Sequence, residues 1–164
     1  MIFVTVGSQM PFPRLVRAVD EWAQLNPAVE VLAQVGSDTS YRPSALQAFA
    51  SVSPARYAEL VAACDVMVAH AGMGSVLTAL EHGKPMILMP RRGALMETRN
   101  DHQLATLRWL ERRAGIYAAA DEADLKAALD LWHLRGMAPP EQPGEDSRSD
   151  SLQSLINTLR AFIG

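Results

Sequence analysis

Short apolar runs alternate along the chain with longer segments in which apolar residues recur at helical spacing. The runs are rich in β-branched residues and end at glycine, serine or proline, which is typical of buried strands closed by turns. They predict strands at residues 2–6, 30–35, 47–52, 66–69, 86–89 and 115–119. The periodic segments predict helices between residues 12 and 25, 53 and 64, 75 and 83, 100 and 110, and 121 and 134.

Two of these helices carry recognisable start signals. Ser53 followed by Pro54 offers an N-cap and a proline at the first helical position. Asp121, with Asp124 three residues further on, resembles a capping box. Both signals support the alternation of strands and helices.

This alternation predicts a Rossmann-like α/β domain, a parallel sheet with helices on both faces, because parallel strands need crossover connections of roughly a dozen residues or more. We assign residues 1–135 to this domain, 136–150 with their three prolines to a linker, and 151–164 to a C-terminal amphipathic helix. That helix can dock on a partner or on the domain's own sheet. Ligands of such sheets bind at the carboxyl ends of the strands. The loops expected on that face begin at Gly7, Val52, His70, Pro90 and Ala120.

Composition and charge exclude several classes of protein. Apolar residues make up 49% of the chain and charged residues 20%, which excludes a disordered or collagen-like protein. With 15 basic and 18 acidic residues the net charge is −3, so nucleic acid is not expected as a partner. The single cysteine, Cys64, excludes an internal disulfide and indicates a reducing compartment. We expect Cys64 to be a buried core residue and the Arg91-Arg92 pair to be solvated.

The chain shows no signal for export or for membrane insertion. Met1 runs directly into the first predicted strand without a leader pattern. The most apolar stretch, residues 60–80, is interrupted by Asp65 and His70 and lacks the roughly 18 uninterrupted apolar residues of a membrane span. We therefore expect a cytoplasmic protein whose membrane association, if any, is indirect.

The strongest chemical signal is the segment His70-Ala71-Gly72-Met73-Gly74-Ser75, which follows a predicted strand and opens a helix. Its glycines let the backbone approach a ligand closely, and a helix N-terminus offers free N–H groups and the positive end of its dipole, which suits a phosphate or diphosphate. His70 and Ser75 can add side-chain donors. A tight turn that needs glycine, with a histidine satisfied by backbone groups, explains the same pattern.

Other phosphate loops and nucleophile motifs fit this segment less well. A P-loop needs lysine after its last glycine, where this chain has Ser75. A dinucleotide fingerprint and a G-x-S-x-G elbow both need a glycine where it has Leu77. Nucleotide triphosphatase activity, NAD or FAD binding and serine hydrolase chemistry are therefore disfavoured.

Two further segments can border the same crevice. Asn100-Asp101-His102-Gln103 places a carboxylate and amides at a helix start, where they can bind the vicinal hydroxyls of a sugar, although Asn100 or Asp101 can equally cap the helix. Gly7-Ser8 puts small residues and free N–H groups on the same face as His70. An ordinary turn explains Gly7-Ser8 nearly as well.

Taken in order, these motifs resemble those of the C-terminal, nucleotide-sugar-binding half of GT-B glycosyltransferases of the family 28 type. The resemblance covers roughly residues 2 to 134, and the set is far more specific than any single member. The chain is similar in particular to the single-domain subunits of two-component transferases, of the Alg13 type and of the PssE/EpsF-like type of bacterial exopolysaccharide assembly. The motifs are Val4-Thr5-Val6-Gly7-Ser8, His70-Ala71-Gly72-x-Gly74-Ser75, Gly83-Lys84-Pro85, Pro90 and Asp101-His102-Gln103.

The resemblance implies a role for each candidate residue. Many relatives place a carboxylate for the ribose hydroxyls where this chain has Thr78, and a neutral hydroxyl is the weaker partner. The donor diphosphate would be held by Gly7, Ser8, His70, Gly72, Gly74 and Ser75. The nucleoside would be bound by Val52, Ser53 and Thr78, and the sugar by Asp101, His102 and Gln103.

The resemblance also implies a partner, because GT-B enzymes place two such domains across a cleft and this sequence supplies one. The partner would be a membrane-associated, Alg14- or PssD-like subunit that binds a lipid-linked acceptor, contributes the catalytic base and holds the protein peripherally at the inner membrane. The reaction would be an inverting transfer from a UDP-sugar, with no metal or other cofactor. His70, Ser75 and the helix N-terminus would stabilise the leaving nucleoside diphosphate.

Two other functions stay open from the sequence alone. A nucleotide-sugar-binding regulator or scaffold without transferase activity is the main alternative. A sugar-nucleotide epimerase of the same fold is less favoured, because it needs both domains in one longer chain.

Overall fold

The computed structural model describes residues 1–136 except 9, 38–39, 99–101 and 111–112. The predicted linker beyond Gly136 and the predicted helix over 151–164 lie outside the described residues, so this division of the chain stays a prediction. The strands are β1 (Ile2–Thr5), β2 (Val31–Gln34), β3 (Gln47–Phe49), β4 (Val66–His70), β5 (Met86–Met89) and β6 (Ile116–Ala118). The helices are α1 (Pro13–Leu25), α2 (Pro54–Ala63), α3 (Met73–Glu81), α4 (His102–Leu110), α5 (Glu122–Arg135) and the 3-10 helix η1 (Gly93–Leu95).

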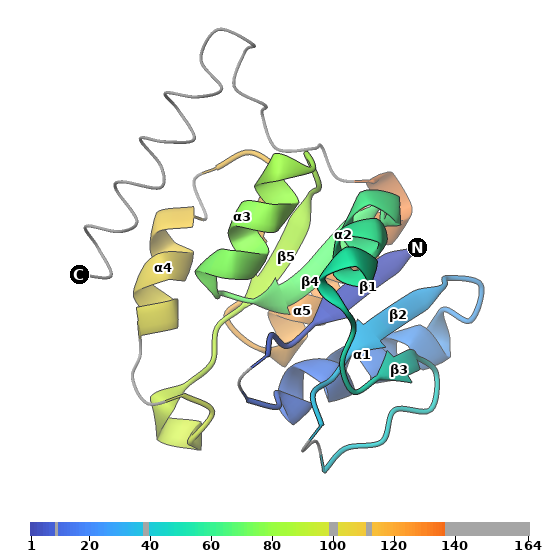
Figure 1. Ribbon diagram of the computed structural model, residues 1–164, viewed down its shortest axis with the longest axis horizontal. Helices are drawn as coiled ribbons and strands as arrows, with labels where there is room; N and C mark the ends of the chain where they lie inside the picture. The colour runs from blue at the N-terminus through green and yellow to red at the C-terminus, as the bar shows by residue number, and fades with distance from the viewer. Residues whose placement is uncertain (9, 38–39, 99–101, 111–112, 137–164) are drawn as a thin grey trace, which may run out of the picture.

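The strands form one parallel sheet in the order β3-β2-β1-β4-β5-β6 (Figure 1). β1 lies inside the sheet, where Ile2 is opposite Val31 of β2 on one side and Val66 of β4 on the other. The chain therefore builds outward from β1 to β3, returns to β4 and builds outward again to β6. This arrangement confirms the predicted Rossmann-like α/β fold, and its topological switch point lies between β1 and β4.

Helices cover both faces of the sheet, as expected for parallel strands buried on both sides. Neighbouring residues of β1 face opposite cores, since Val4 packs with α1 and α5 while Phe3 packs with α2, α3 and α4. Figure 1 shows α2 and α3 in front of the sheet and α1 behind it. Cys64 is 1% exposed and belongs to the core on the α2 side, as predicted.

The two predicted helix starts are capped. The hydroxyl of Ser53 accepts the Arg56 N–H at 3.2 Å at the start of α2. Asp121 caps α5 by accepting the N–H of Asp124 at 3.0 Å. The reciprocal bond of a capping box is not made to Asp121: the carboxylate of Asp124 accepts the Ala120 N–H at 3.1 Å, one residue earlier.

Two element boundaries differ from the sequence expectation. β3 ends at Phe49 rather than near Val52, since this edge strand pairs only with β2. α3 begins at Met73, so Gly74 lies in the first helical turn rather than in the loop before it. The second difference matters for the candidate site, because it places a glycine at the helix N-terminus itself.

A buried carboxylate that the sequence did not predict holds the connection between β2 and β3. Asp20 is 1% exposed and accepts the N–H groups of Ala45 at 2.7 Å and Ser44 at 3.0 Å, together with the Tyr41 hydroxyl at 2.8 Å. Burial acts to raise its pKa, but these hydrogen bonds outweigh burial, and the pKa of Asp20 lies below its ordinary value. The long connection is therefore fixed to α1.

Candidate donor-binding site

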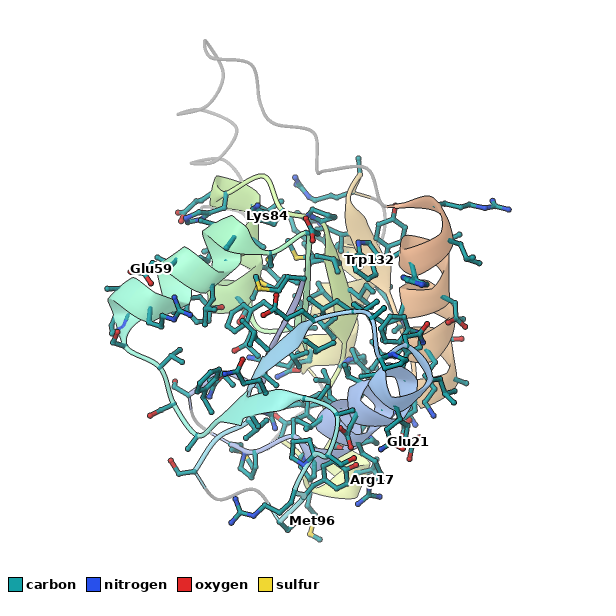
Figure 2. All side chains as sticks on the ribbon, turned by 90° about the vertical axis from the view of Figure 1, so that its right-hand side faces the viewer. Arg17, Glu21, Glu59, Lys84, Met96 and Trp132 are labelled. Atoms are coloured by element: carbon teal, nitrogen blue, oxygen red, sulfur yellow. The ribbon has the colours of Figure 1, made fainter. Side chains whose placement is uncertain are left out.

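The carboxyl ends of the strands form one end of the molecule. In Figure 2 this end is lowermost: Lys84, just before β5, lies near the top of the molecule and Met96, after β5, lies at the bottom. The β1–α1, β4–α3 and β5–α4 connections all leave the sheet at this end. Because β1 and β4 are neighbours, the turns after them meet at the switch point.

The imidazole ring of His70 lies between two glycine turns. A Cβ atom on Gly7 would lie 2.6 Å from Nε2 of His70, and a Cβ atom on Gly72 would lie 2.0 Å from Cε1 and 2.6 Å from Nδ1. The ring therefore leaves no room for a side chain at either position. Gly7 also has a φ of +79°, which L side chains rarely adopt. The structure thus brings Gly7, His70 and Gly72 together at the switch point.

His70 is neutral at pH 7. Burial of the ring and, second, the positive charge of Arg91 lower the pKa of His70 to about 4, and a hydrogen bond with the Gln103 side chain offsets little of this shift. Among the described residues, its buried Nδ1 atom has no hydrogen-bond partner. A buried polar atom without a partner costs roughly 1–3 kcal/mol. A histidine fully satisfied by backbone groups is therefore not what the structure contains.

α3 begins directly after this turn, and its N-terminus has no side-chain cap. Gly72 is the N-cap residue and supplies none, whereas Ser53 and Asp121 cap α2 and α5. The first N–H groups of a helix have no intrahelical partner and attract anions. A Cβ atom on Gly74 would meet nothing within 4 Å, so the absent side chain leaves open space at the helix N-terminus.

Ser75 and Thr78 already have partners within the domain. Ser75 is 8% exposed, and its side chain interacts with the Tyr57 hydroxyl of α2, where it opposes the rise in the Tyr57 pKa caused by burial. The Thr78 hydroxyl donates to the carbonyl oxygen of Gly74 at 3.0 Å, which leaves its lone pairs available as acceptors. A diphosphate that uses the Ser75 hydroxyl would share it with Tyr57.

Polar side chains at the ends of two buried strands hold the turn after β1. The Thr5 hydroxyl donates to Oε1 of Gln34 at 2.7 Å and accepts the Gly7 N–H at 3.2 Å. Nε2 of Gln34 donates to the Gly7 carbonyl oxygen at 3.0 Å. The expectation of a free N–H group at Gly7 is therefore wrong, because Thr5 uses it. Ser8, the other predicted residue of this turn, is exposed.

The two residues predicted near the nucleoside base lie further along the same end of the sheet. Val52 is half-buried against the core on the α2 side, and the Ser53 hydroxyl is occupied as the N-cap of α2. Both follow β3, which β2 and β1 separate from β4. They are therefore placed for the far end of an extended ligand rather than for its phosphates.

The structure contradicts the expectation that the Arg91-Arg92 pair is solvated. Arg91 is 4% exposed, and only Arg92 is half-exposed. Two adjacent arginines in a sequence do not reveal that carbonyl oxygens from another connection converge on one of them. The planar guanidinium matches such a set of acceptors, which an ammonium group cannot do. Arg91 donates to the carbonyl oxygens of Val6 and Pro11 at 2.7 Å each, of Glu97 at 3.3 Å, and of Met10.

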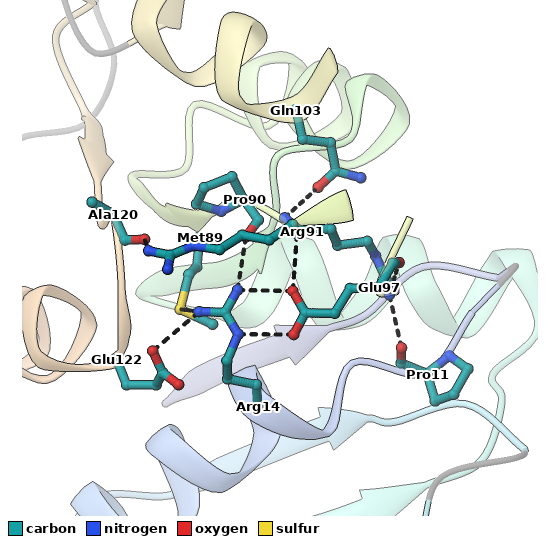
Figure 3. A network of polar contacts seen from close by, with 10 residues as sticks. Pro11, Arg14, Met89, Pro90, Arg91, Glu97, Gln103, Ala120 and Glu122 are labelled. Carbon is teal, nitrogen blue, oxygen red and sulfur yellow. Dashed lines mark hydrogen bonds and ion pairs between the residues drawn. The ribbon is translucent and has the colours of Figure 1, made fainter. Parts of the chain in front are cut away.

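A second, partly buried arginine lies beside it (Figure 3). Arg14 of α1 forms a two-pronged ion pair with Glu97, with Nε–Oε1 and Nη2–Oε2 distances of 2.8 and 2.9 Å, and the two side chains are 13% and 11% exposed. Arg14 also pairs with Glu122 at 3.1 Å and donates to the Pro90 carbonyl oxygen at 3.0 Å. These contacts join α1, the β5–α4 connection and the start of α5.

Gln103 connects this arginine cluster to His70. Its Oε1 atom accepts the Arg91 N–H at 3.0 Å, and its side chain lies near enough to the His70 ring to affect the pKa of that ring. Of the other two predicted sugar-binding residues, His102 is the first residue of α4, and Asp101 lies outside the described residues. Gln103 is thus the predicted sugar residue that the structure brings into contact with the diphosphate candidates.

Sequence reasoning missed the supporting residues Thr5, Gln34 and Arg91, although a signal for them exists. Thr5 and Gln34 are the last residues of buried strands, and Arg91 follows β5 after one proline. Polar residues at the carboxyl ends of adjacent buried strands are placed to stabilise the turns of the ligand face.

Comparison with known families agrees with these motifs. The sequence model of the glycosyltransferase family 28 C-terminal domain matches residues 1–157. The chain belongs to this family. No curated protein matches the sequence of this family 28 chain.

Solved structures share its fold at low sequence identity. The solution NMR structure of ALG13 is 20% identical with a TM-score of 0.60, over 94% of this chain and 96% of that one. UDP-glucose:anthocyanidin 3-O-glucosyltransferase in complex with UDP is 17% identical with a TM-score of 0.59, over 99% of this chain and 36% of that one. The calicheamicin glycosyltransferase CalG4 is 16% identical with a TM-score of 0.55, over 99% of this chain and 43% of that one. The family 28 chain thus spans nearly all of the ALG13 structure and less than half of the other two.

The described part of the family 28 chain contains neither a candidate metal site nor a candidate membrane span. No three His, Cys, Asp or Glu side chains in that part lie close enough together to hold a metal ion. None of the helices in it is long and apolar enough to cross a membrane.

Proposed function

We propose that this family 28 domain is the donor-binding subunit of a two-component inverting glycosyltransferase, which transfers a sugar from a UDP-sugar to a lipid-linked acceptor in bacterial exopolysaccharide biosynthesis. The observation that carries the proposal is the buried, unpartnered Nδ1 atom of His70 next to the uncapped N-terminus of α3. A nucleoside diphosphate fits both features, because its oxygens accept hydrogen bonds and its charge suits the helix dipole.

The neutral state of His70 fits the same ligand. The tautomer that carries its proton on Nδ1 can donate to a phosphate oxygen without requiring protonation of the ring. Gly74 leaves space for the diphosphate at the helix N-terminus, and Gly72 together with the backbone N–H of Ser75 completes this side of the site. Gly7 and Ser8 would form the opposite wall.

The proposed nucleoside and sugar contacts extend from this centre in two directions. Thr78 would accept a hydrogen bond from a ribose hydroxyl, and Val52 and Ser53 would lie near the base. On the β5 side, Asp101, His102 and Gln103 would bind the sugar. The glucosyltransferase structure that holds UDP shares the fold of this chain, which supports uridine diphosphate as the first ligand to test.

In the proposed reaction an acceptor hydroxyl oxygen attacks the anomeric carbon of the donor sugar. The bond from that carbon to the diphosphate oxygen breaks, the configuration inverts, and the hydroxyl proton passes to a base contributed by the partner. His70 and the N-terminus of α3 stabilise the negative charge that develops on the leaving UDP. These groups stabilise the leaving charge through hydrogen bonds and the helix dipole, and no metal or other cofactor is proposed.

The acceptor half would be supplied by a membrane-associated, Alg14- or PssD-like subunit, which would hold the domain peripherally at the cytoplasmic face of the inner membrane. The coverage of nearly the whole ALG13 structure supports a function as one domain of such a pair. Co-purification with a membrane protein would test this part of the proposal.

Calorimetric titration of the full chain tests the donor assignment. The ligands are UDP, UDP-glucose, UDP-glucuronate, UDP-N-acetylglucosamine and, as the control, a GDP-sugar. We expect selective binding of one uridine sugar. Absence of binding to every ligand, both by the chain alone and in the presence of its partner, would contradict the proposal. Selective binding without sugar transfer in the assembled complex would favour the regulatory or scaffold function instead.

A further inference from the structure

Arg91 ties together two connections that are far apart in the sequence. Some of its acceptors lie just before the Gly7-Ser8 turn and others just after it, so hydrogen bonds to one side chain bracket the turn. The remaining acceptor, the carbonyl oxygen of Glu97, belongs to the β5–α4 connection. The acceptors are the carbonyl oxygens of Val6, Met10, Pro11 and Glu97.

Arg91 makes no direct ion pair with a carboxylate in the described part of the chain, although the negative charge of Glu97 acts on it through space. None of the ion pairs found there involves Arg91, and the Glu97 carboxylate pairs with Arg14 instead. Burial lowers the pKa of Arg91, but an arginine stays charged at every ordinary pH. A buried cation whose direct hydrogen bonds go to carbonyl oxygens rather than to a carboxylate is costly for folding, which points to a purpose at the neighbouring site.

Arg91 is also linked, through Gln103, to the β4–α3 connection. Its backbone N–H donates to Oε1 of Gln103, whose side chain lies near enough to the His70 ring to affect the pKa of that ring. Its guanidinium carbon lies 4.7 Å from the centre of the Phe12 ring, which further limits the positions it can take. One residue thus touches the turn after β1, the start of α4 and, through Gln103, the end of β4.

We infer that Arg91 is a positioning residue for the donor, whose guanidinium holds the Gly7-Ser8 turn against His70 so that both walls of the diphosphate site are formed before the ligand arrives. The inference rests on the proposed function and names a residue that supports the same site. A site formed in advance binds more tightly because less ordering remains to be done on binding.

Three variants of the full chain test this inference with UDP as the probe. Arg91→Met removes both the charge and the planar set of donors, whereas Arg91→Lys keeps the charge alone. Arg92→Met is the matched control, since the Arg92 guanidinium donates to the Ala120 carbonyl oxygen and not to the Gly7-Ser8 turn. Calorimetry should show that UDP affinity is reduced about 10-fold or more in both Arg91 variants. In the control it should stay within about 2-fold of the wild-type value. Wild-type affinity in Arg91→Lys would overturn the positioning role, because charge alone would then suffice.

NMR of the unliganded chain supplies a second, ligand-free measurement. Both Arg91 variants should shift the Gly7 and Ser8 amide signals and speed their hydrogen exchange, and only Arg91→Met should raise the pKa of His70 above about 4. If wild type binds neither UDP nor a UDP-sugar, alone or with its partner, the proposed function fails, while these signals still decide whether Arg91 holds the Gly7-Ser8 turn. Unchanged Gly7 and Ser8 amides in Arg91→Lys would overturn the inference, and this variant keeps the test decisive if Arg91→Met does not fold.

Discussion

The arginine cluster and the β4–α3 turn lie at the same end of the sheet but differ in how their polar groups are satisfied. Around Arg14 and Glu97, described contacts pair the charged groups with one another and with carbonyl oxygens. At the β4–α3 turn, Nδ1 of His70 has no partner among the described residues, Gly72 gives α3 no side-chain cap, and Gly74 faces open space.

This difference separates the scaffold of the site from its binding surface. A fully paired cluster gains free energy from its own contacts, and it contributes to stability when no ligand is present. An unpaired group costs free energy in the unliganded protein and recovers it when a ligand supplies the partner. Substitutions in the Arg14–Glu97 pair should therefore change stability, and those in the β4–α3 turn should change donor affinity.

The largest effect is expected for Arg14→Met, which breaks the buried ion pair. Removal of the guanidinium leaves the Glu97 carboxylate, 11% exposed, with the Arg92 N–H as its described donor. We expect the free energy of unfolding to fall by about 3–5 kcal/mol, measured by urea denaturation. UDP affinity should stay within about 3-fold of the wild-type value at temperatures where the variant is folded.

Arg56→Met is the matched control for this prediction. Arg56 forms an ion pair with Glu59 on the surface of α2, and the two side chains are 54% and 63% exposed. It should cost less than about 1 kcal/mol. Equal losses of stability in the two variants would remove the distinction between a buried cluster and an ordinary surface pair.

The next largest effect is a pH dependence of stability caused by His70. The unfolded chain takes up a proton near the ordinary histidine pKa of 6.5, whereas the folded protein does so only near 4. The unfolded state therefore binds more protons between these values, and stability falls as the pH drops from 6.5 to 4, by up to about 3 kcal/mol.

Urea denaturation of wild type and His70→Gln near pH 7 and near pH 4.5 measures this contribution. The variant lacks the titrating ring, so its stability should fall less over this range than that of wild type. Parallel losses of stability in the two proteins would show that His70 titrates normally in the fold.

A smaller effect is expected for donor binding by His70→Gln. The variant loses a hydrogen bond to a charged phosphate, which corresponds to about 1.5–3 kcal/mol of UDP binding free energy. His82→Gln, at the exposed end of α3, is the control and should bind UDP as wild type does. Unchanged UDP affinity in His70→Gln would exclude the β4–α3 turn as the diphosphate site.

The smallest effect sharpens the comparison within a single turn. Gly74→Ala adds a methyl group that meets nothing within 4 Å, so it should leave the fold intact or stabilise it by up to about 1 kcal/mol while weakening UDP binding. Gly72→Ala would place its Cβ atom 2.0 Å from the His70 ring and should destabilise the fold. Thermal unfolding and calorimetry together distinguish the two glycines, and a Gly74→Ala protein that binds UDP normally would show that no ligand approaches this position.

The architecture could be predicted from the sequence because it depends on local patterns. The buried strands, the helical periodicity and the caps at Ser53 and Asp121 are all properties of short segments, and the structure confirms them. The glycine turn after His70 was predictable for the same reason. Its position relative to Gly7 followed from the strand order of a Rossmann-like sheet.

The supporting contacts could not be predicted in this way, because they join residues that are far apart in the chain. The burial of Arg91 depends on carbonyl oxygens more than 80 positions away, at Val6 and Met10. The engaged N–H of Gly7 depends on which way the Thr5 hydroxyl turns. The pattern of charges along the sequence indicates neither of these contacts, so it predicts a solvated arginine pair.

The long sequence separation of the Arg14 contacts also bears on how the protein is made. Glu97 and Glu122 follow Arg14 by 83 and 108 residues. At roughly 5–20 residues per second, the ribosome delivers these partners on the order of 5 to 20 s after Arg14. Until then the first helix has emerged without these counter-charges, although β4 has already followed β1. The candidate donor-binding end is therefore among the last parts of the domain to be completed during translation.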